Sequence, residues 1–349
     1  MTTSDHTTQE ESKTVTTMKA ARMHDYGGPE VLKVDQVPMP TCGPKDVLIE
    51  VHASAVNPID WKIRKGINRA VIRKNLPATL GMDVSGVVTQ VGSKVTRFKV
   101  GDEVFSSPSH KREGTYAEYV VIEADQVAPK PSNLTHQEAA SIPLVGLTAW
   151  NCLVDAAQLQ KGEHVFIEAG AGGVGTFAIQ LAKHLGATVS TTCSPRNEGF
   201  VRELGADHVV DYRSERFEEV LPPQDVVLEA MGGDSKERAL KILKPGGRLT
   251  SINSDMSNLT KKHGPNIGVL AVAARLINIT VSSRLCHKVR FHSVIRTPDG
   301  QNLAKIGQLL EQGAIKPLID RVFPLDQIAD AHRYSEEGHA RGKIIIQVR

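Results

Sequence analysis

The 349-residue sequence predicts an α/β protein in which a doubly wound parallel sheet is joined to a β-rich domain. From Met18 to residue 142, short segments of alternating apolar residues are separated by glycine and proline turns, which is typical of a compact β domain. From Pro143 to residue 297, apolar strands alternate with helical stretches, which indicates a parallel sheet covered on both faces. A glycine-rich segment, residues 169–175, joins the first of these strands to its helix.

The two ends of the chain differ in composition. Residues 1–17 are polar and lack the apolar stretch of a secretory signal, so we expect a disordered tail. Residues 298–349 have the pattern of a helix, a strand, a second helix and a final strand at 343–348. We expect this closing segment to return to the first domain, because its last strand would otherwise lack a partner sheet.

Composition and charge exclude several function classes. The net charge is only +3 and the basic residues are spread along the chain, which argues against nucleic-acid binding. The apolar run Gly268–Ala274 stops at Arg275 and is too short to span a bilayer, so no membrane partner is expected. The four cysteines are far apart and form no CxxC pair, which fits a reducing, cytoplasmic setting without disulfides.

The glycine-rich segment Ala169-Gly170-Ala171-Gly172-Gly173-Val174-Gly175 follows one strand and opens a helix. This context is typical of a dinucleotide-binding loop. Gly172 and Gly173 would let the backbone approach a diphosphate, which Val174 and the helix N-terminus then bind, and Gly175 would let the helix pack closely on the strand. The alternative is a glycine-rich turn without a ligand.

The end of the second strand of this unit decides which dinucleotide is expected. An NAD site usually has an acidic residue there, but the sequence reads Ser194-Pro195-Arg196-Asn197 and has no carboxylate before Glu198. A hydroxyl, a guanidinium and an amide suit a 2′-phosphate, so Ser194, Arg196 and Asn197 predict NADP(H). The alternative is that Ser194 caps the next helix, with Pro195 at its first position, while Arg196 is solvated.

The order of motifs resembles that of the medium-chain dehydrogenase/reductase superfamily from Met18 to Arg349, and in particular its zinc-free quinone oxidoreductases and alkenal/one reductases. The resemblance is carried by YGGPEVL with VLIEVHASAVNPIDWKIRKG, by LGMDVSGVV with VGDEVF, by AGAGGVGTFAIQLAKHLGA with LGADHVVDY, and by GHARGKIII. It implies a GroES-like catalytic domain at 18–142, a Rossmann domain at 143–297, and an active site in the cleft between them.

The sequence departs from the zinc-dependent members of this superfamily. Where those enzymes have a Cys ligand this chain has Asn57, and where they have a His ligand it has Met82. Asparagine is a poor zinc ligand and a thioether prefers softer metals, so no metal is expected.

The resemblance also implies the catalytic and cofactor residues. Asn57 and Asp60 would floor the nicotinamide pocket, although Asn57 followed by Pro58 is also a helix start. Lys62 and Thr148 would lie beside the nicotinamide; the alternatives are a solvated lysine and a threonine that bonds its own helix. The remaining expected cofactor contacts are Tyr212, Ile252, Asn253 and Lys343.

We therefore expect an NADPH-dependent, zinc-independent reductase of quinones or of activated C=C bonds in α,β-unsaturated carbonyls. Two alternatives stay open: an enoyl-thioester reductase, and a catalytically silent NADPH-binding redox sensor. The β-favouring run Asn278–Ser282 is predicted as the last strand of the parallel sheet. Relatives pair two such edges across a two-fold axis, so we expect a homodimer through this strand.

Overall fold

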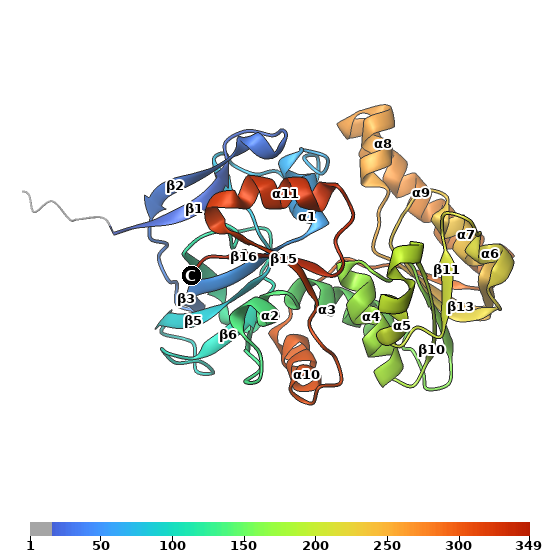
Figure 1. Ribbon diagram of the computed structural model, residues 1–349. Helices are drawn as coiled ribbons and strands as arrows, with labels where there is room; N and C mark the ends of the chain where they lie inside the picture. Colours follow the sequence, from blue (N-terminus) through green and yellow to red (C-terminus); the bar gives the residue numbers. More distant parts are fainter. Residues whose placement is uncertain (1–15) are drawn as a thin grey trace, which may run out of the picture.

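The computed structural model describes residues 16–349, apart from the side chains of Ser257, Lys261, Pro265 and Asn266. Two sheet-based parts lie side by side in Figure 1, the N-terminal one in blue and cyan and the other in green to yellow. Most of the expected tail lies outside the described residues. Its last residue, Thr17, instead begins strand β1 (Thr17–Met23), so the first strand starts one residue earlier than predicted.

The N-terminal part contains two sheets. The smaller one has the order β2-β1-β4, with β2 at Leu32–Pro38 and β4 at Ala78–Thr79. The larger one has the order β15-β16-β3-β5-β6-β8, and β7 pairs with β3. Its strands are β3 (Asp46–Val56), β5 (Val84–Val91), β6 (Glu103–Ser106), β7 (Tyr119–Glu123), β8 (Val127–Pro129), β15 (Ile319–Pro324) and β16 (Lys343–Gln347).

The last strand of the chain, β16, lies in this N-terminal sheet. It runs antiparallel to β3, with Ile344 opposite Val56 and Ile346 opposite Ser54. The register places Lys343, the first residue of β16, beside Asn57, which follows the last residue of β3. Two segments that are far apart in the sequence thus meet at one point.

The second part is a six-stranded parallel sheet with the order β11-β10-β9-β12-β13-β14. This order reverses direction at β9, which is the arrangement of dinucleotide-binding sheets, with the ligand crevice at the carboxyl ends of the strands. The strands are β9 (His164–Ile167), β10 (Thr188–Cys193), β11 (His208–Asp211), β12 (Gln224–Glu229), β13 (Leu243–Ser251) and β14 (Arg290–Ser293).

Helices cover both sheets and form the main core between them. Leu147 and Phe177 of the helices beside β9 pack in one buried cluster with Ile167 and Ile306. The helices are α1 (Pro58–Arg64), α2 (His136–Ala140), α3 (Pro143–Trp150), α4 (Gly173–His184), α5 (Glu198–Glu203), α6 (Phe217–Val220), α7 (Ser235–Ile242), α8 (Met256–His263), α9 (Pro265–Cys286), α10 (Gly300–Glu311) and α11 (Ile328–Glu336).

The predicted strand at Asn278–Ser282 is wrong, because these residues lie inside α9. The last strand of the sheet is β14, which begins at Arg290. The run is rich in β-branched residues, but Val272, Ile279 and Ser283 are buried at helical spacing, so packing of one helix face overrides the local preference for a strand.

Candidate functional site

The glycine-rich loop connects β9 to α4 in a tight path. Ala169 has a positive φ of 57°, and Gly172 is the N-cap of α4. A Cβ atom on Gly175 would lie 2.3 Å from the carbonyl oxygen of Ala169, and one on Gly170 would lie 2.2 Å from Thr191 Oγ1. Glycine is therefore required at both positions for the helix to pack on the sheet.

The opposite side of this loop is open. A Cβ on Gly172 would have only the Ala169 carbonyl oxygen nearby, at 3.3 Å. The first N–H groups of α4, from Gly173 to Gly175, have no partner within the helix, and the helix dipole favours an anion there. The loop thus offers free donors to a phosphate group.

A cavity of about 390 Å³ lies at the carboxyl ends of β9 to β12. It is closed from the other side by residues 338–340 of the loop before β16. The structure brings five of the predicted cofactor residues together around it, namely Gly172, Ser194, Arg196, Asn197 and Tyr212.

Two arginines of this cavity have no carboxylate partner among the described residues. Arg196 Nη2 donates to the His339 carbonyl at 3.3 Å, and Arg213, which the sequence reasoning missed, lies 5.9 Å from the ring of Tyr212. The Oδ1 atom of Asn197 is buried without a hydrogen bond, while Ser194 caps the following turn through its backbone only. Unneutralised guanidinium groups next to open helix N–H groups fit a dinucleotide that carries an additional phosphate.

Lys343, Asn57 and Asp83 form a second polar group, which we call the Lys343 cluster. The Lys343 ammonium donates to Asn57 Oδ1, to Asp83 Oδ2 at 3.1 Å and to the Val56 carbonyl at 3.2 Å. Asn57 Nδ2 donates to Asp83 Oδ2 at 2.8 Å. All three residues are at most 4% exposed. The buried Lys343 cation therefore lies between Asn57 and Asp83. Asn57 is one of the two positions compared with zinc ligands, and Asp83 follows the other, Met82.

The Lys343 cluster touches the phosphate loop. Gly342 N donates to the Ala171 carbonyl at 3.1 Å, and a Cβ on Gly173 would lie 3.0 Å from Lys343 Cδ. The aliphatic part of Lys343 thus runs beside the start of α4, whereas its ammonium is directed to Asn57 and Asp83. The cluster lies where the two parts of the molecule meet.

Asp60 supports Asn57 from the first turn of α1. Asp60 Oδ2 accepts hydrogen bonds from Asn57 N and from the Tyr116 hydroxyl, both at 2.8 Å. Burial raises the pKa of Asp60 to about 6, and burial together with Asp60 raises the pKa of Tyr116 well above its usual value. Tyr116 is fully buried, in agreement with a structural role.

Lys62 and Thr148 differ in how far their polar groups are satisfied. Burial lowers the pKa of Lys62, whose ammonium lies 5.6 Å from the Trp61 ring and has no hydrogen-bond or ion-pair partner among residues 16–349. The Thr148 hydroxyl donates to the Leu144 carbonyl at 2.7 Å, and Leu144 N donates to Asp83 Oδ1 at 2.7 Å. Thr148 therefore bonds its own helix and is linked through Leu144 to the Lys343 cluster.

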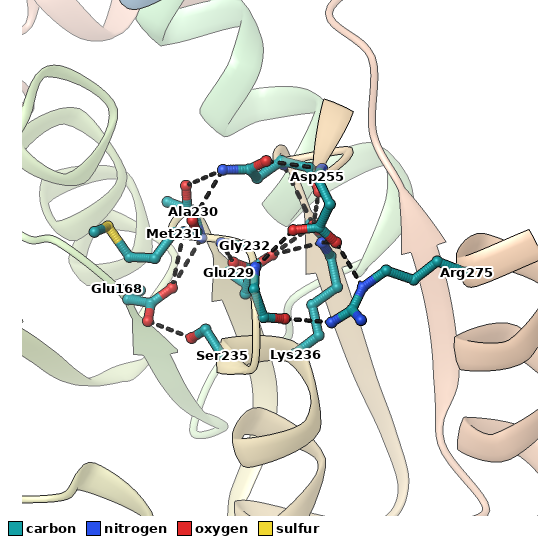
Figure 2. A network of polar contacts seen from close by, with 12 residues as sticks. Glu168, Glu229, Ala230, Met231, Gly232, Ser235, Lys236, Asp255 and Arg275 are labelled. Carbon is teal, nitrogen blue, oxygen red and sulfur yellow. Dashed lines mark hydrogen bonds and ion pairs between the residues drawn. The ribbon is translucent and has the colours of Figure 1, made fainter. Parts of the chain in front are cut away.

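A third polar group, which was not predicted, lies at the ends of β9, β12 and β13 (Figure 2). We call it the carboxylate clamp; it consists of Glu168, Glu229, Lys236, Asp255 and Arg275. Lys236 Nζ lies 2.6 Å from Asp255 and 3.8 Å from Glu229, and Arg275 Nε donates to Asp255 at 2.9 Å. Glu168 accepts from the backbone N–H groups of Ala230 and Met231.

One of the predicted cofactor residues, Asn253, lies beside the clamp and bonds its backbone. Asn253 Nδ2 donates to the Met231 carbonyl at 3.0 Å, and its Oδ1 accepts from Asp255 N at 3.0 Å. Ile252, its neighbour, is half-buried against the main core, and neither residue lines the cavity. Both belong to the loop after β13 that the clamp fixes.

A further contact that the sequence reasoning missed joins the segment after β14 to the loop after β6. The Arg296 guanidinium donates to the carbonyls of Ser107 and Pro108, at 2.6 Å and 3.0 Å. Burial lowers the pKa of Arg296. No sequence motif marks this arginine, because its partners are carbonyl groups on a distant loop.

Known proteins resemble the chain over nearly its whole length, and two family models match parts of it. Residues 43–132 match the model "Alcohol dehydrogenase GroES-like domain", and residues 204–346 match "Zinc-binding dehydrogenase". The "NAD(P)H oxidoreductase RTN4IP1, mitochondrial" of Bos taurus is 36% identical over 361 residues, which cover 95% of this chain and 90% of that protein. The "NADPH-dependent alkenal/one oxidoreductase, chloroplastic" of Arabidopsis thaliana is 36% identical over 340 residues, covering 94% and 79%.

The quinone oxidoreductase of Coxiella burnetii is among the solved structures with the same fold. It has a TM-score of 0.84 and is 35% identical, covering 96% of this chain and 100% of that one. The predicted combination of a GroES-like domain with a Rossmann sheet is thereby confirmed.

Proposed function

The chain belongs to the medium-chain dehydrogenase/reductase superfamily, and on this premise we propose that it is an NADPH-dependent reductase of quinones or of activated C=C bonds in α,β-unsaturated carbonyls. The names of its relatives support an oxidoreductase that uses NAD(P)H. The observation that carries the proposal is the Lys343 cluster. The ammonium group of Lys343 is bound by Asn57 and Asp83. Asn57 stands at one position where alcohol-oxidising relatives have a zinc ligand, and Asp83 follows the other.

NADPH, when bound, supplies the hydride, and the chain supplies its binding and orientation. The free N–H groups at the start of α4 would bind the diphosphate. The unneutralised Arg196 guanidinium, the Ser194 hydroxyl and the unpaired Asn197 Oδ1 would bind the adenosine end, with Tyr212 against it. Further cofactor contacts would come from Gly172, Gly173, Val174, Gly175, Ile252, Asn253 and Lys343.

Lys62 is the residue best suited to stabilise charge on the acceptor. Its ammonium is half-buried without a partner among the described residues, and burial lowers its pKa. A substrate oxygen that becomes negative during hydride addition would provide the missing partner. Thr148 can still accept a hydrogen bond at its hydroxyl oxygen, while Asn57 and Asp60 hold the floor of the pocket. The one proton that the reduction needs besides the hydride can come from solvent.

We propose that the reaction is independent of zinc. Removing hydride from a simple alcohol requires an alkoxide, which zinc enzymes obtain by coordinating the oxygen. At the corresponding place this chain has a buried amide, a thioether in the core at Met82, and a carboxylate that is already paired with lysine. A quinone or an enone needs no alkoxide, because the oxygen that takes up charge is conjugated to the carbon that receives hydride.

A substrate panel tests the proposal. NADPH oxidation should be rapid with a water-soluble quinone or with an alkenal, and NADP⁺ reduction by propanol should be at background. Metal analysis of the purified protein should find far less than one zinc per chain. Alcohol oxidation that a strong chelator abolishes would overturn the proposal, and so would inert quinones and enones.

We also propose the following organisation. The catalytic domain comprises 18–142 and the returning segment 298–349, and the Rossmann domain comprises 143–297. The protein forms a homodimer through the edge of β14, the last strand of the parallel sheet. Residues 278–282, which the sequence predicted as this strand, lie in α9. It acts in the cytoplasm on a small molecule without binding nucleic acid, although the two relatives described above carry mitochondrial and chloroplast names. Light scattering at micromolar concentration tests the dimer.

A further inference from the structure

The outer face of α9 is apolar and uncovered. Ile267, Leu270, Ile277, Val281 and Leu285 are between 49% and 73% exposed. Their spacing of three, seven, four and four residues places the last four along one stripe of the helix. In Figure 1, α8 and α9 form the upper right edge of the molecule, and α8 stands clear of the other elements. Exposed aliphatic surface of this extent marks an interaction site.

The inner face of α9 is held firmly by the protein. Ile279 is 4% exposed and packs in one core cluster with Phe166 and Leu249. Arg275, which ends the apolar run in the sequence, turns inward to the carboxylates of Asp255 and Glu237. The Arg275 charge, which in the sequence argued against a membrane partner, is therefore absent from the outer face of α9. The apolar stripe continues along that face on both sides of position 275.

The helix has the length and hydropathy of a membrane span, but its packing excludes a spanning position. Residues Ile267–Cys286 form a 20-residue stretch with a mean hydropathy of 1.5. Crossing a bilayer would remove Ile279 from the core and Arg275 from its two carboxylates. A helix fixed on one side and apolar on the other suits a position on a membrane surface.

The segment around α9 is also basic. Residues 256–298 contain seven Lys and Arg residues and no Asp or Glu, in a chain whose total net charge is only +3. Lys262 lies before the start of α9, Arg284 in its last turn, and Lys288 and Arg290 just after it. These four side chains are exposed and have no ion pair with any residue that the structure describes.

We propose that the outer face of α9, with the basic residues at its two ends, docks on the surface of an anionic lipid bilayer. The boundary of the acyl chains accommodates the aliphatic stripe, and acidic headgroups neutralise Lys262, Arg284 and Lys288. A second copy of the chain fits less well on this face, because a two-fold contact would bring the same basic residues together and residues 256–298 contain no carboxylate to neutralise them. Docking requires neither cofactor nor substrate, so its test is independent of the proposed reaction.

Sedimentation of the full-length protein with lipid vesicles tests the proposal. The protein should co-sediment with vesicles of phosphatidylcholine that contain roughly one-third phosphatidylglycerol, and remain in solution with phosphatidylcholine alone. Binding should weaken strongly at about 1 M salt, where charges are screened within about 3 Å. Equal binding to both kinds of vesicle, or to neither, would overturn the proposal.

Two pairs of variants separate this surface from general stickiness. Ile277→Gln with Leu285→Gln should reduce vesicle partitioning at least about tenfold, whereas Val100→Gln with Val220→Gln, which are also exposed apolar side chains, should not. Lys262→Gln with Arg284→Gln and Lys288→Gln should reduce it about a hundredfold, whereas Lys33→Gln with Lys94→Gln and Lys99→Gln should not.

The controls decide the remaining outcomes. All variants change exposed side chains, so thermal unfolding should match that of the natural chain. Vesicle binding that the α9 variants leave unchanged would overturn the proposal. Loss of a dimer in the Ile277→Gln, Leu285→Gln protein, without vesicle binding by the natural chain, would assign the face to self-association and would also overturn it.

Discussion

The molecule contains two buried ionic groups that are built in different ways. The Lys343 cluster pairs one cation with one carboxylate, Asp83, and a neutral amide, Asn57. The carboxylate clamp contains two cations and three carboxylates, whose oxygen atoms also accept hydrogen bonds from the backbone N–H groups of residues 230–233 and from the hydroxyls of Ser235 and Ser251. The clamp thus fixes main-chain loops, whereas the Lys343 cluster joins side chains of separate strands at the meeting point of the two domains.

Asp255 of the clamp and Asp83 of the Lys343 cluster differ in their electrostatic balance. Burial would raise the pKa of Asp255, but Lys236, the Gly233 N–H and Arg275 outweigh it and lower that pKa. For Asp83, burial dominates and its pKa is raised despite Lys343 and Asn57. Asp255 therefore stays charged firmly, whereas burial raises the pKa of Glu229 in the clamp and of Asp83 in the Lys343 cluster, and both are closer to taking up a proton.

Removing the central cation of the clamp should have the largest effect. Lys236→Met leaves Glu229 and Asp255, both at most 3% exposed, without their ammonium partner. We expect a loss of about 3–5 kcal/mol in the free energy of unfolding, measured by urea denaturation. Lys241→Met on the exposed side of the same helix is the matched control and should change it by less than about 0.5 kcal/mol. Similar values for the two variants would contradict the role of the clamp.

The corresponding change in the Lys343 cluster should be milder. Lys343→Met leaves one buried carboxylate, which keeps its hydrogen bonds from Asn57 Nδ2 and Leu144 N. Its raised pKa also allows it to take up a proton. We expect a loss of about 3 kcal/mol near neutral pH, at the lower end of the range for broken buried pairs. A loss larger than that of Lys236→Met would show that the two groups do not differ as described.

The sequence signals for these two groups were unequal. Asn57 and Lys343 lie in motifs, and the antiparallel pairing of β3 with β16 explains why segments 286 residues apart meet. Glu168, Glu229 and Asp255 are single charged residues at the ends of separate strands. Each is indistinguishable in sequence from a solvated surface charge, so only the parallel alignment of the strand ends reveals the clamp.

Features of the fold that depend on local steric limits could be predicted best from the sequence. Features in which tertiary packing opposes a local preference could be predicted least. Gly175 was predicted to allow close packing of α4, and its missing Cβ is required by the Ala169 carbonyl. The run at residues 278–282 favours a strand by composition, yet it is helical, because burial of Ile279 and Ser283 on one face decides its structure. The orientation of Arg275 likewise depends on Asp255, which no periodicity indicates.

Asp60, which binds Asn57 N beside the Lys343 cluster, offers a test of burial through pH. Its pKa is about 6 in the folded chain and near 4 when unfolded, so the folded chain binds more protons between these values. The contribution of Asp60 to stability is therefore greatest below about pH 4 and is lost as pH rises through 6. Asp60→Asn removes this dependence, and its stability relative to the natural chain should increase by about 2 kcal/mol from pH 4 to 7.

Thermal unfolding measured across this pH range checks the prediction for Asp60. Asp326→Asn changes an exposed carboxylate, 67% accessible, and should leave the pH profile unchanged. Parallel profiles for Asp60→Asn and the natural chain would mean that Asp60 is ionised normally, and that burial does not raise its pKa.

The smallest expected effect lies at the cofactor cavity, because its cation, Arg196, is exposed whereas Lys236 and Lys343 are buried. Arg196 has no carboxylate partner among the described residues and contacts only the carbonyl of His339. Arg196→Ala should weaken NADPH binding by about 1.5 kcal/mol, or roughly tenfold, because it removes one charge-assisted hydrogen bond to the 2′-phosphate. NADH lacks that phosphate, so its dissociation constant should not change.

Fluorescence titration of the natural chain and of Arg196→Ala with both nucleotides measures these dissociation constants. High salt should reduce the difference between the two proteins, since an exposed contact is screened more than a buried one. An equal loss for both nucleotides would place Arg196 near a part that they share, and the preference for NADPH would then depend on Ser194, Asn197 or Arg213.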